Sequence, residues 1–413
     1  MKPALYGQEV FLKNVILLTI DALRKDRLGC YGSTKGLTPF LDTLQDKCLV
    51  FTKAQAIGPY TQASFPGILT SSYHLDYGHD EELSLQKTLI SEPLQDAGIV
   101  TAAFHSNLYM SDLVGWNRGW DVFYDSMEDE VDPKIPYIRG PEMNQKIGNW
   151  LSSYVKTDSR PFFAWLHFMD VHEPYMPDRK YVELVDPSLS LSQEEMYSLF
   201  ENTLLKRNVS DGPKVELLSR LYDIHVREVD MYVEEFFQSL ERLDVLKDSV
   251  VFFTSDHGDE FGEHGGLSHD DKMYSELIDI PLIIYDPSRV KKEICDTLVS
   301  NLDIPPTILN VFGLQPEETF QGHSLIPLES YPKKGCFGEA LFHEAGKGED
   351  INRDIYFYRE NDLKIIYRAN LDAWEMYDLE RDPGERENIV ATSPDAERLK
   401  NILKPRVRRW QKK

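Results

Sequence analysis

The sequence predicts an α/β protein that has a large, mostly parallel sheet flanked by helices, followed by a small antiparallel sheet with one covering helix. Apolar, β-branched runs alternate with amphipathic helical patterns over the greater part of the chain, and short strand patterns separated by turns follow near its end. We therefore expect a large catalytic α/β domain over residues 1–327 and a C-terminal subdomain over residues 328–413.

Three apolar runs predict the central strands of the large sheet. They cover residues 14–20, 162–168 and 249–254. Helical patterns over residues 143–154 and 218–243 precede the second and third runs, which is typical of strands joined by crossover helices. Because ligands of parallel sheets bind beyond the carboxyl ends of the strands, the polar residues that follow these runs are the first candidates for a site.

The rest of the chain predicts a surface excursion and the second sheet. Residues from about 182 to 217 are polar and helical. After Pro327, short strand patterns cover residues 355–358, 363–367 and 374–377, and the turns between them favour antiparallel pairing. A final helix is predicted over residues 394–410.

Composition excludes several classes of protein. The 413 residues include 41% hydrophobic residues, enough for a full core, and 45 Lys and Arg stand against 69 Asp and Glu, a net charge of −24. This charge repels polyphosphate and anionic lipid, so we expect neither a nucleic-acid partner nor a membrane. Six Lys and Arg residues between Lys404 and Lys413 could form a nucleic-acid patch, but we interpret them as cations that complement the end of the last helix.

Cysteine usage and the amino terminus predict a cytoplasmic protein. The four cysteines lie far apart and form no C-x-x-C pair, which argues against a disulfide framework or a zinc ribbon. The apolar run at residues 15–20 is too short to span a bilayer, and no signal-peptide pattern accompanies it.

The predicted strand ends carry residues that bind metal ions. Asp21 follows the first run, Asp170 and His172 follow the second, and Asp256 and His257 follow the third. Carboxylates and a neutral imidazole gathered around one point suit Zn²⁺ or Mn²⁺, and a site with fewer imidazoles suits Mg²⁺ or Ca²⁺. The alternative is that each Asp caps the helix that follows it, but three strand ends together favour a metal site.

A hydroxyl-rich segment over residues 58–71 is the second candidate. Thr61 or Ser64, near a helix amino terminus, could coordinate the metal ion and attack a phosphorus or sulfur centre. The alternative is an ordinary N-cap hydroxyl.

Several motifs together resemble the sulfatase family of the alkaline phosphatase superfamily. They follow the family's order from about residue 14 to 389, and Thr61 with Thr70 lies between the second and third of them. The motifs are TIDALRKDRLGCYG, TPFLDTL, MDVHEPY (169–175), YDIHVREVD (222–230), TSDHGDEFGEHG, LDIPPTILNVFG (302–313), QGHSLIPL (321–328) and MYDLERDPGERENI (376–389).

The resemblance implies an alkaline phosphatase-like fold and roles for individual residues. Asp21 and Asp256 correspond to metal-binding carboxylates, and His257 stands where part of the family has Asn. Thr61 stands at the nucleophile position, where sulfatases have a Cys or Ser that is oxidised to formylglycine. His172 corresponds to a histidine that contacts the substrate.

His269 stands near the position of a family Lys, and Lys364 matches a Lys that we expect to be structural here. Phe65 replaces a cation of the family motif. The family's Gly-Lys-Trp-His segment appears as His105-Ser106-Asn107, so we expect His105 or Asn107, together with Ser64, to contact the substrate.

Threonine at the nucleophile position changes the predicted chemistry. Thr61 cannot become formylglycine, so no formylglycine is expected and the covalent intermediate would be an ordinary threonine ester. Such an ester lacks the second hydroxyl through which a formylglycine hydrate expels sulfate, whereas water can open a phosphothreonine in line. The residues therefore favour phosphate mono- or diesters over sulfate esters.

The function predicted from the sequence is a metal-dependent hydrolase that acts on a small anionic ester. Asp21, Thr61, Asp256 and His257 would hold Mn²⁺, Zn²⁺, Mg²⁺ or Ca²⁺, and Thr61 would attack in line. His172 or His269 would protonate or orient the leaving group, and a second ion through Asp170, His172 or His269 is left open, as is the oligomeric state. The alternatives are a phosphoryl or phosphoglycerol transferase, and a non-catalytic relative that binds an anion.

Overall fold

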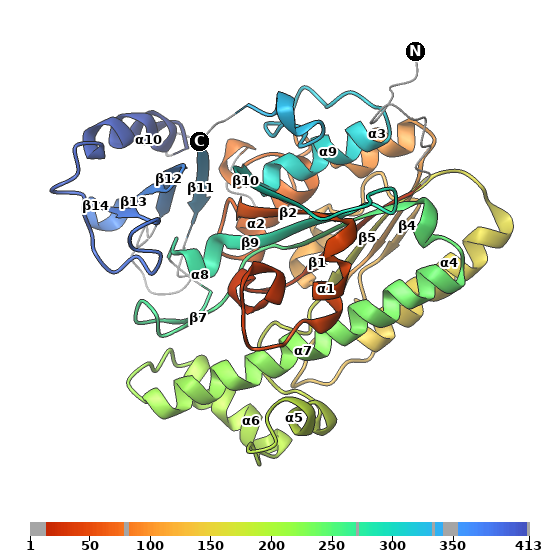
Figure 1. Ribbon diagram of the computed structural model, residues 1–413, viewed down its shortest axis with the longest axis horizontal. Coiled ribbons are helices and arrows are strands. Elements are labelled where there is room, and N and C mark those ends of the chain that lie inside the picture. Colours follow the sequence, from red (N-terminus) through yellow and green to blue (C-terminus); the bar gives the residue numbers. More distant parts are fainter. Residues whose placement is uncertain (1–13, 78–81, 270–271, 333–334, 342–353, 411–413) are drawn as a thin grey trace.

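An eight-stranded sheet runs through the larger part of the protein (Figure 1). The computed structural model describes residues 14–77, 82–269, 272–332, 335–341 and 354–410. The strand order is β10 (Glu293–Ser300), β2 (Cys48–Gln55), β9 (Asp279–Tyr285), β6 (Ser249–Ser255), β1 (Asn14–Ile20), β5 (Phe162–Phe168), β3 (Val100–Phe104) and β4 (Val122–Tyr124).

Neighbouring strands of this sheet are parallel except around β9, which runs antiparallel to both β2 and β6. The predicted mostly parallel sheet is therefore confirmed, and the antiparallel strand is an addition. The sequence of β9 does not reveal the direction of the strand. DIPLIIY is as apolar as the neighbouring parallel strands and is buried from Ile280 onward.

The three central strands are β6, β1 and β5, and their pairing sets the position of the site. Ile20, the last residue of β1, pairs with Ser255 on one side and with Phe168 on the other. Each of these strands is fully buried, as the apolar runs predicted. Because the three strands end in register, the residues that follow them lie side by side at one edge of the sheet.

Helices cover both faces of the large sheet. The first face packs against α1 (Pro39–Thr43), α4 (Gly140–Thr157) and α7 (Gly212–Arg242), whose apolar residues share one core with alternate residues of β1 and β5. The opposite face packs against α2 (Thr61–Thr70), α3 (Ser91–Asp96) and α9 (Ile304–Val311). Figure 1 shows the two groups of helices on either side of the strands.

The long helix α7 begins six residues before its predicted start. Asp211 caps it, with its side chain accepting a hydrogen bond from the Lys214 backbone N–H, and Pro213 lies in the first turn. The predicted excursion before it contains α5 (Arg179–Val185), α6 (Gln193–Leu199) and a π-helical turn (Phe200–Leu204). Short elements near the site are β7 (Glu260–Phe261), β8 (Leu267–Ser268) and α8 (Ser275–Ile278).

A second sheet of four antiparallel strands lies in the C-terminal part of the described chain. Its order is β11 (Cys336–Ala340), β12 (Ile355–Glu360), β13 (Leu363–Arg368) and β14 (Ala373–Asp378). The last helix α10 (Ala396–Trp410) covers it, as predicted, and places Trp410 against Tyr356. Strand β11 was not predicted because its sequence, CFGEA, contains a glycine and a glutamate. The domain boundary at residues 327 and 328 stays a prediction.

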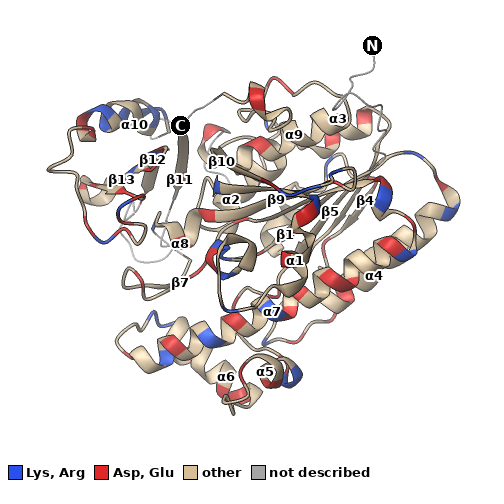
Figure 2. Cartoon of the chain, in the orientation of Figure 1, with Lys and Arg blue, Asp and Glu red and all other residues tan. Residues whose placement is uncertain are grey.

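The basic end of α10 packs partly inward. The Arg406 guanidinium lies 4.2 Å from the centroid of the Tyr73 ring, and Arg409 pairs with Asp76 at 3.1 Å. Both contacts support a helix end that complements the acidic body, while Lys412 and Lys413 lie outside the described residues. Figure 2 shows charged residues mainly on the helices and loops around the sheet. Within the described residues, no helix is both long enough and apolar enough to cross a membrane.

Candidate active site

Three of the predicted ligands meet where β1 and β6 end. Asp21 follows β1, and Asp256 and His257 follow β6, and all three side chains are fully buried. One ligand atom from each of the three lies within 4.8 Å of the other two. His257 Nε2 is 3.6 Å from Asp21 Oδ1 and 3.4 Å from Asp256 Oδ2. The structure thus brings the predicted carboxylates and imidazole to one point.

Each ligand residue forms protein hydrogen bonds through one polar atom and directs a second polar atom toward the point where the three side chains meet. His257 Nδ1 donates to the Gly258 carbonyl oxygen at 3.0 Å, so Nε2 carries a free lone pair. Asp256 Oδ1 accepts hydrogen bonds from the backbone N–H groups of Ala22 and His257. Asp21 Oδ1 and His257 Nε2 are buried without a hydrogen-bond partner, and buried polar atoms of this kind need an explanation.

The electrostatics of this cluster fit a cation. Burial raises the pKa of Asp256, and the neighbouring Asp21 carboxylate raises it further. Burial alone would also raise the pKa of Asp21, but His172, the hydrogen bond from His167 and His257 together lower it below its ordinary value. Two buried carboxylates with oxygens within 4.8 Å of each other hold negative charge that a divalent ion would neutralise. Mixed oxygen and nitrogen donors are those that such ions bind.

Thr61 is the first residue of α2, directly beside the cluster. Its side chain is 4% exposed, and its Oγ1 donates to Asp256 Oδ2 at 3.2 Å. Tyr60 forms the N-cap in an extended conformation without a side-chain cap, so Thr61 is not the N-cap hydroxyl of the alternative interpretation. The helix amino terminus carries partial positive charge, which favours an anion next to Thr61.

His172 and His269 lie together at the same edge, with ring centroids 5.1 Å apart. His172 Nδ1 donates to the Glu173 carbonyl oxygen at 2.7 Å, which leaves Nε2 available. His269 Nδ1 donates to Asp259 Oδ1 at 2.8 Å, and its ring centroid is 4.4 Å from that of His257. Burial would lower the pKa of His269, but Asp259 and Glu173 raise it to about 10, so this imidazole is cationic near neutral pH.

Asp259 and His167 belong to this arrangement although the sequence did not single them out. Asp259 is fully buried and forms a second possible donor group with His257 and His269. His167 Nε2 faces Asp21 Oδ2 at 3.3 Å. Asp259 stands within the D-H-G-D sequence and could have been found by that motif, whereas His167 is hidden in the apolar run of β5.

Asp170 does not join the donor groups found among the described residues. Its Oδ1 accepts a hydrogen bond from the Gly140 N–H, and burial followed by the nearby Glu228 raises its pKa to about 7. For a second ion, which the sequence left open, the other donor group near His257 consists of Asp259 and, in its neutral form only, His269. Asp170 lies outside this group.

Two of the three predicted substrate-binding residues, Ser64 and Asn107, donate hydrogen bonds to predicted metal ligands. Ser64 donates to the Asp256 carbonyl oxygen at 2.7 Å and accepts from Asn301, which fixes α2 to the end of β6. His105 is fully buried and stacks on Trp165, and burial lowers its pKa to about 3. Asn107 donates to Asp21 Oδ2 at 3.0 Å. Direct contact of these residues with a substrate stays a prediction.

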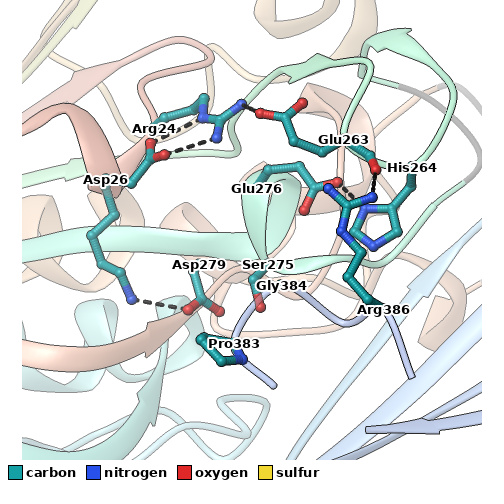
Figure 3. Close-up of a pocket in the computed structure, with 11 residues that line it drawn as sticks. Arg24, Asp26, Glu263, His264, Ser275, Glu276, Asp279, Pro383, Gly384 and Arg386 are labelled. Atoms are coloured by element: carbon teal, nitrogen blue, oxygen red, sulfur yellow. Dashed lines mark hydrogen bonds and ion pairs between the residues drawn. The ribbon is translucent and has the colours of Figure 1, made fainter. Parts of the chain in front are cut away.

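A separate polar pocket of about 300 Å³ contains none of these residues (Figure 3). Arg24 lines it and pairs with Asp26 and Glu263. Lys25 pairs with Asp279 at the same pocket. Arg24 and Lys25 already have carboxylate partners, and Arg386 donates to the Glu263 carbonyl oxygen, so we assign this pocket no ligand.

Comparison of the sequence with family models gives two matches. Residues 13–314 match the family described as sulfatase, and residues 262–413 match the C-terminal region of N-sulphoglucosamine sulphohydrolase. Among characterised proteins, an N-acetylglucosamine-6-O-sulfatase of Bacteroides thetaiotaomicron is 24% identical over 96% of this chain and 86% of its own length.

Solved structures share the fold at low sequence identity. One, in complex with its substrate D-glucosamine-2-N,6-O-disulfate, has a TM-score of 0.79 and 21% identity, and the match covers 97% of this chain and 98% of that one. A phosphonate monoester hydrolase of Agrobacterium radiobacter has a TM-score of 0.78 and 19% identity, with 97% and 96% covered. The predicted alkaline phosphatase-like fold is confirmed.

Proposed function

Since the chain belongs to the sulfatase family of ester hydrolases, we propose that it is a metal-dependent hydrolase that cleaves a small anionic ester, phosphate in preference to sulfate. The observation that carries this proposal is the convergence of Asp21 Oδ1, Asp256 Oδ2 and His257 Nε2 beside the hydroxyl of Thr61. A divalent ion on these atoms would lower the pKa of the Thr61 hydroxyl and offset the charge of the ester.

Thr61 supplies the nucleophile in this proposal. Its hydroxyl hydrogen points at a carboxylate oxygen of Asp256, which is the arrangement that removal of the proton requires. Attack of Oγ1 forms a threonine ester and releases the alcohol, and water then opens that ester in line. Threonine has a single hydroxyl on Cβ, so expulsion of sulfate by elimination is closed to it, and this favours a phosphate ester.

We assign protonation of the leaving group to His172 and His269, which lie at the open edge of the cluster. The His269 side chain is 16% exposed, more than any of the proposed ligands, and Asp259 keeps it protonated. A cationic imidazole there can hold a negatively charged ester and donate a proton to the departing oxygen. His172 has its Nε2 free for the same purpose, and the Asp21 carboxylate raises its pKa against the effect of burial.

Sulfate ester cleavage is the second candidate, because relatives of this chain are named as sulfatases. The Bacteroides relative is an N-acetylglucosamine-6-O-sulfatase, and a relative from Clostridium perfringens that is 22% identical is an arylsulfatase. A sulfate ester would meet the same ligands and the same Thr61. The difference lies in the second step, where the threonine ester has to be opened.

The test is a matched pair of substrates. We expect metal-loaded protein to hydrolyse 4-nitrophenyl phosphate or its methyl diester with a higher kcat/KM than 4-nitrophenyl sulfate. Mn²⁺, Zn²⁺, Mg²⁺ and Ca²⁺ are compared in turn. Faster cleavage of the sulfate would contradict the phosphate preference. Bound metal without turnover of any of the three would contradict the enzyme and favour an anion-binding relative.

A further inference from the structure

We propose that His167 is a positioning residue that confines Asp21 to one metal-binding oxygen and thereby favours a small ion such as Mn²⁺ or Zn²⁺ over Ca²⁺. The proposal rests on the metal site of the proposed function. His167 lies inside β5 and is fully buried, as are Asp21 and Thr19 on the neighbouring strand β1 and its end.

A chain of hydrogen bonds orients the His167 ring. Trp165 Nε1 can only donate, and it donates to Thr19 Oγ1 at 3.0 Å. Thr19 Oγ1 lies 2.8 Å from His167 Nδ1, closer than its other acceptor, the Leu166 carbonyl oxygen at 3.4 Å. The hydroxyl therefore donates to Nδ1, and Nε2 carries the hydrogen. The pairing of β1 with β5 makes this chain possible, because Thr19 and His167 are register partners.

His167 and Asn107 together occupy one oxygen of Asp21. His167 Nε2 faces Oδ2 at 3.3 Å, and a carboxylate oxygen can only accept, so the hydrogen bond runs from the ring to Asp21. Asn107 Nδ2 donates to the same Oδ2 at 3.0 Å. The Tyr109 N–H binds Asn107 Oδ1, which fixes the orientation of that amide. Oδ1 is left as the only unpartnered oxygen of Asp21.

This restraint bears on the size of the ion. Ca²⁺ takes six to eight oxygen ligands and commonly binds carboxylates through both oxygens. Asp256 is also restricted to one oxygen, because backbone N–H groups of Ala22 and His257 occupy its Oδ1. Two single-oxygen carboxylates, one imidazole and one hydroxyl form a small, mixed donor set that suits Mn²⁺ or Zn²⁺.

Three variants separate positioning from simple packing. His167→Gln places an amide nitrogen four bonds from Cα, as Nε2 is, and keeps the donor to Asp21. His167→Asn places its nitrogen three bonds from Cα, as Nδ1 is, so it can reach Thr19 but loses Asp21. His167→Phe keeps a ring against Phe65, whose centroid is 5.0 Å away, and removes both hydrogen bonds.

The measurement is the dissociation constant of the metal-free protein for Mn²⁺ and for Ca²⁺, by calorimetry. We expect wild type to bind Mn²⁺ more tightly than Ca²⁺. We expect His167→Asn and His167→Phe to lose about 10-fold or more in Mn²⁺ affinity, with Ca²⁺ affinity unchanged or improved. His167→Gln should stay within about threefold of wild type for both ions. Thermal unfolding of the metal-free variants controls for folding.

The outcomes separate this proposal from the function on which it rests. If wild type binds no divalent ion, the metal site itself is contradicted. If wild type binds Mn²⁺ and the Gln and Asn variants show the same ratio of Mn²⁺ to Ca²⁺ affinity, His167 is only a packed core residue and this inference is overturned. If Phe prevents folding, the Gln and Asn pair alone decides, since these two differ in which nitrogen of the ring they replace.

Discussion

The Thr61 hydroxyl lies both at the start of helix α2 and against a buried carboxylate. Its Oγ1 lies 3.2 Å from Asp256 Oδ2, and the His257 ring lies against the same oxygen. Ser64 does not lie at this position, because its hydroxyl is hydrogen-bonded to Asp256 and Asn301, and the residue at the position is not a Cys. At the residue scale, the proposed chemistry therefore depends on an unmodified threonine.

Replacement of Thr61 tests this directly. We expect Thr61→Ala to lower kcat by roughly 10³-fold or more, because the nucleophile is removed, with Mn²⁺ binding weakened far less. Thr61→Ser keeps the hydroxyl and serves as the matched control, with activity within about 10- to 100-fold of wild type. Steady-state kinetics and metal calorimetry check both. A Thr61→Ala variant of full activity would remove Thr61 from the mechanism.

Individual residues also show what a sequence can and cannot predict. Asp21 and Asp256 were predictable because each follows an apolar strand, and strand ends gather in a parallel sheet. Ser64 and His105 were predicted to bind substrate; the structure gives the Ser64 hydroxyl protein partners, and His105 Nδ1 accepts a hydrogen bond from the Asn107 N–H while its Nε2 has no partner. Burial in three dimensions is not visible in a motif, and contact of these two residues with a substrate stays a prediction. His167 looked like part of a core strand because its partners lie elsewhere in the sequence, Thr19 on β1 and Asp21 directly after it.

At the element scale, the loop between β6 and α8 links the site to the C-terminal sheet. Lys364 on β13 and Glu385, in the turn after β14, form an ion pair of 2.6 Å, and both side chains are fully buried. Glu385 also accepts a hydrogen bond from the Ser275 backbone N–H at the start of α8. Lys364 is structural, as expected, and it holds the segment that follows Asp256, His257 and Asp259.

Breaking this ion pair should destabilise the protein. We expect Lys364→Met to cost about 3–5 kcal/mol, because Glu385 is left buried and charged without its partner. The double variant Lys364→Met with Glu385→Gln should recover most of that loss, since Gln keeps an acceptor for Ser275. Urea unfolding of both variants measures this. Equal stability of the single and double variants would contradict the assignment.

Most helices and strands were predictable from the sequence, but the direction of β9 and the presence of β11 were not. The periodicity of α4 and α7 and the apolar runs of β1, β5 and β6 are local signals. The direction of β9 and the presence of β11 depend on which strands lie beside them, and single-strand sequences do not contain this information.

For the whole molecule, a net charge of −24 opposes the binding of an anionic ester. The family's extra cation is replaced by Phe65, which packs against Trp165 in the core. In the proposed function, local positive charge comes from a divalent ion on the ligands, from His269 and from the start of α2. The cytoplasmic location stays a prediction.

The junction between the two sheets holds a carboxyl group that should make stability depend on pH. Glu339 on β11 is fully buried, its Oε2 has no hydrogen-bond partner, and its backbone N–H donates to the Ile57 carbonyl oxygen of the large unit. Burial, opposed by a hydrogen bond from the Leu75 N–H, raises the pKa of Glu339 from 4.5 to about 8. The folded protein therefore favours protonated Glu339.

Because the folded pKa lies above the unfolded one, this contribution to stability is complete below pH 4.5 and is lost as the pH rises through about 8. We expect Glu339→Gln, which cannot ionise, to flatten the decline in unfolding free energy between pH 5 and pH 8 by roughly 3 kcal/mol. Denaturant unfolding at several pH values compares the two proteins. Parallel curves would contradict the raised pKa.

The central claim is that Thr61 forms the covalent intermediate without prior oxidation. The most direct measurement is high-resolution mass spectrometry of the peptide that contains Thr61, before and after acid quenching of the metal-loaded protein during turnover of an aryl phosphate. We expect an unmodified threonine before the reaction and a phosphoryl group on Thr61 after it, absent in Thr61→Ala. Turnover at full rate with no adduct on Thr61 at any quench time, and with Thr61→Ala equally active, would contradict the account.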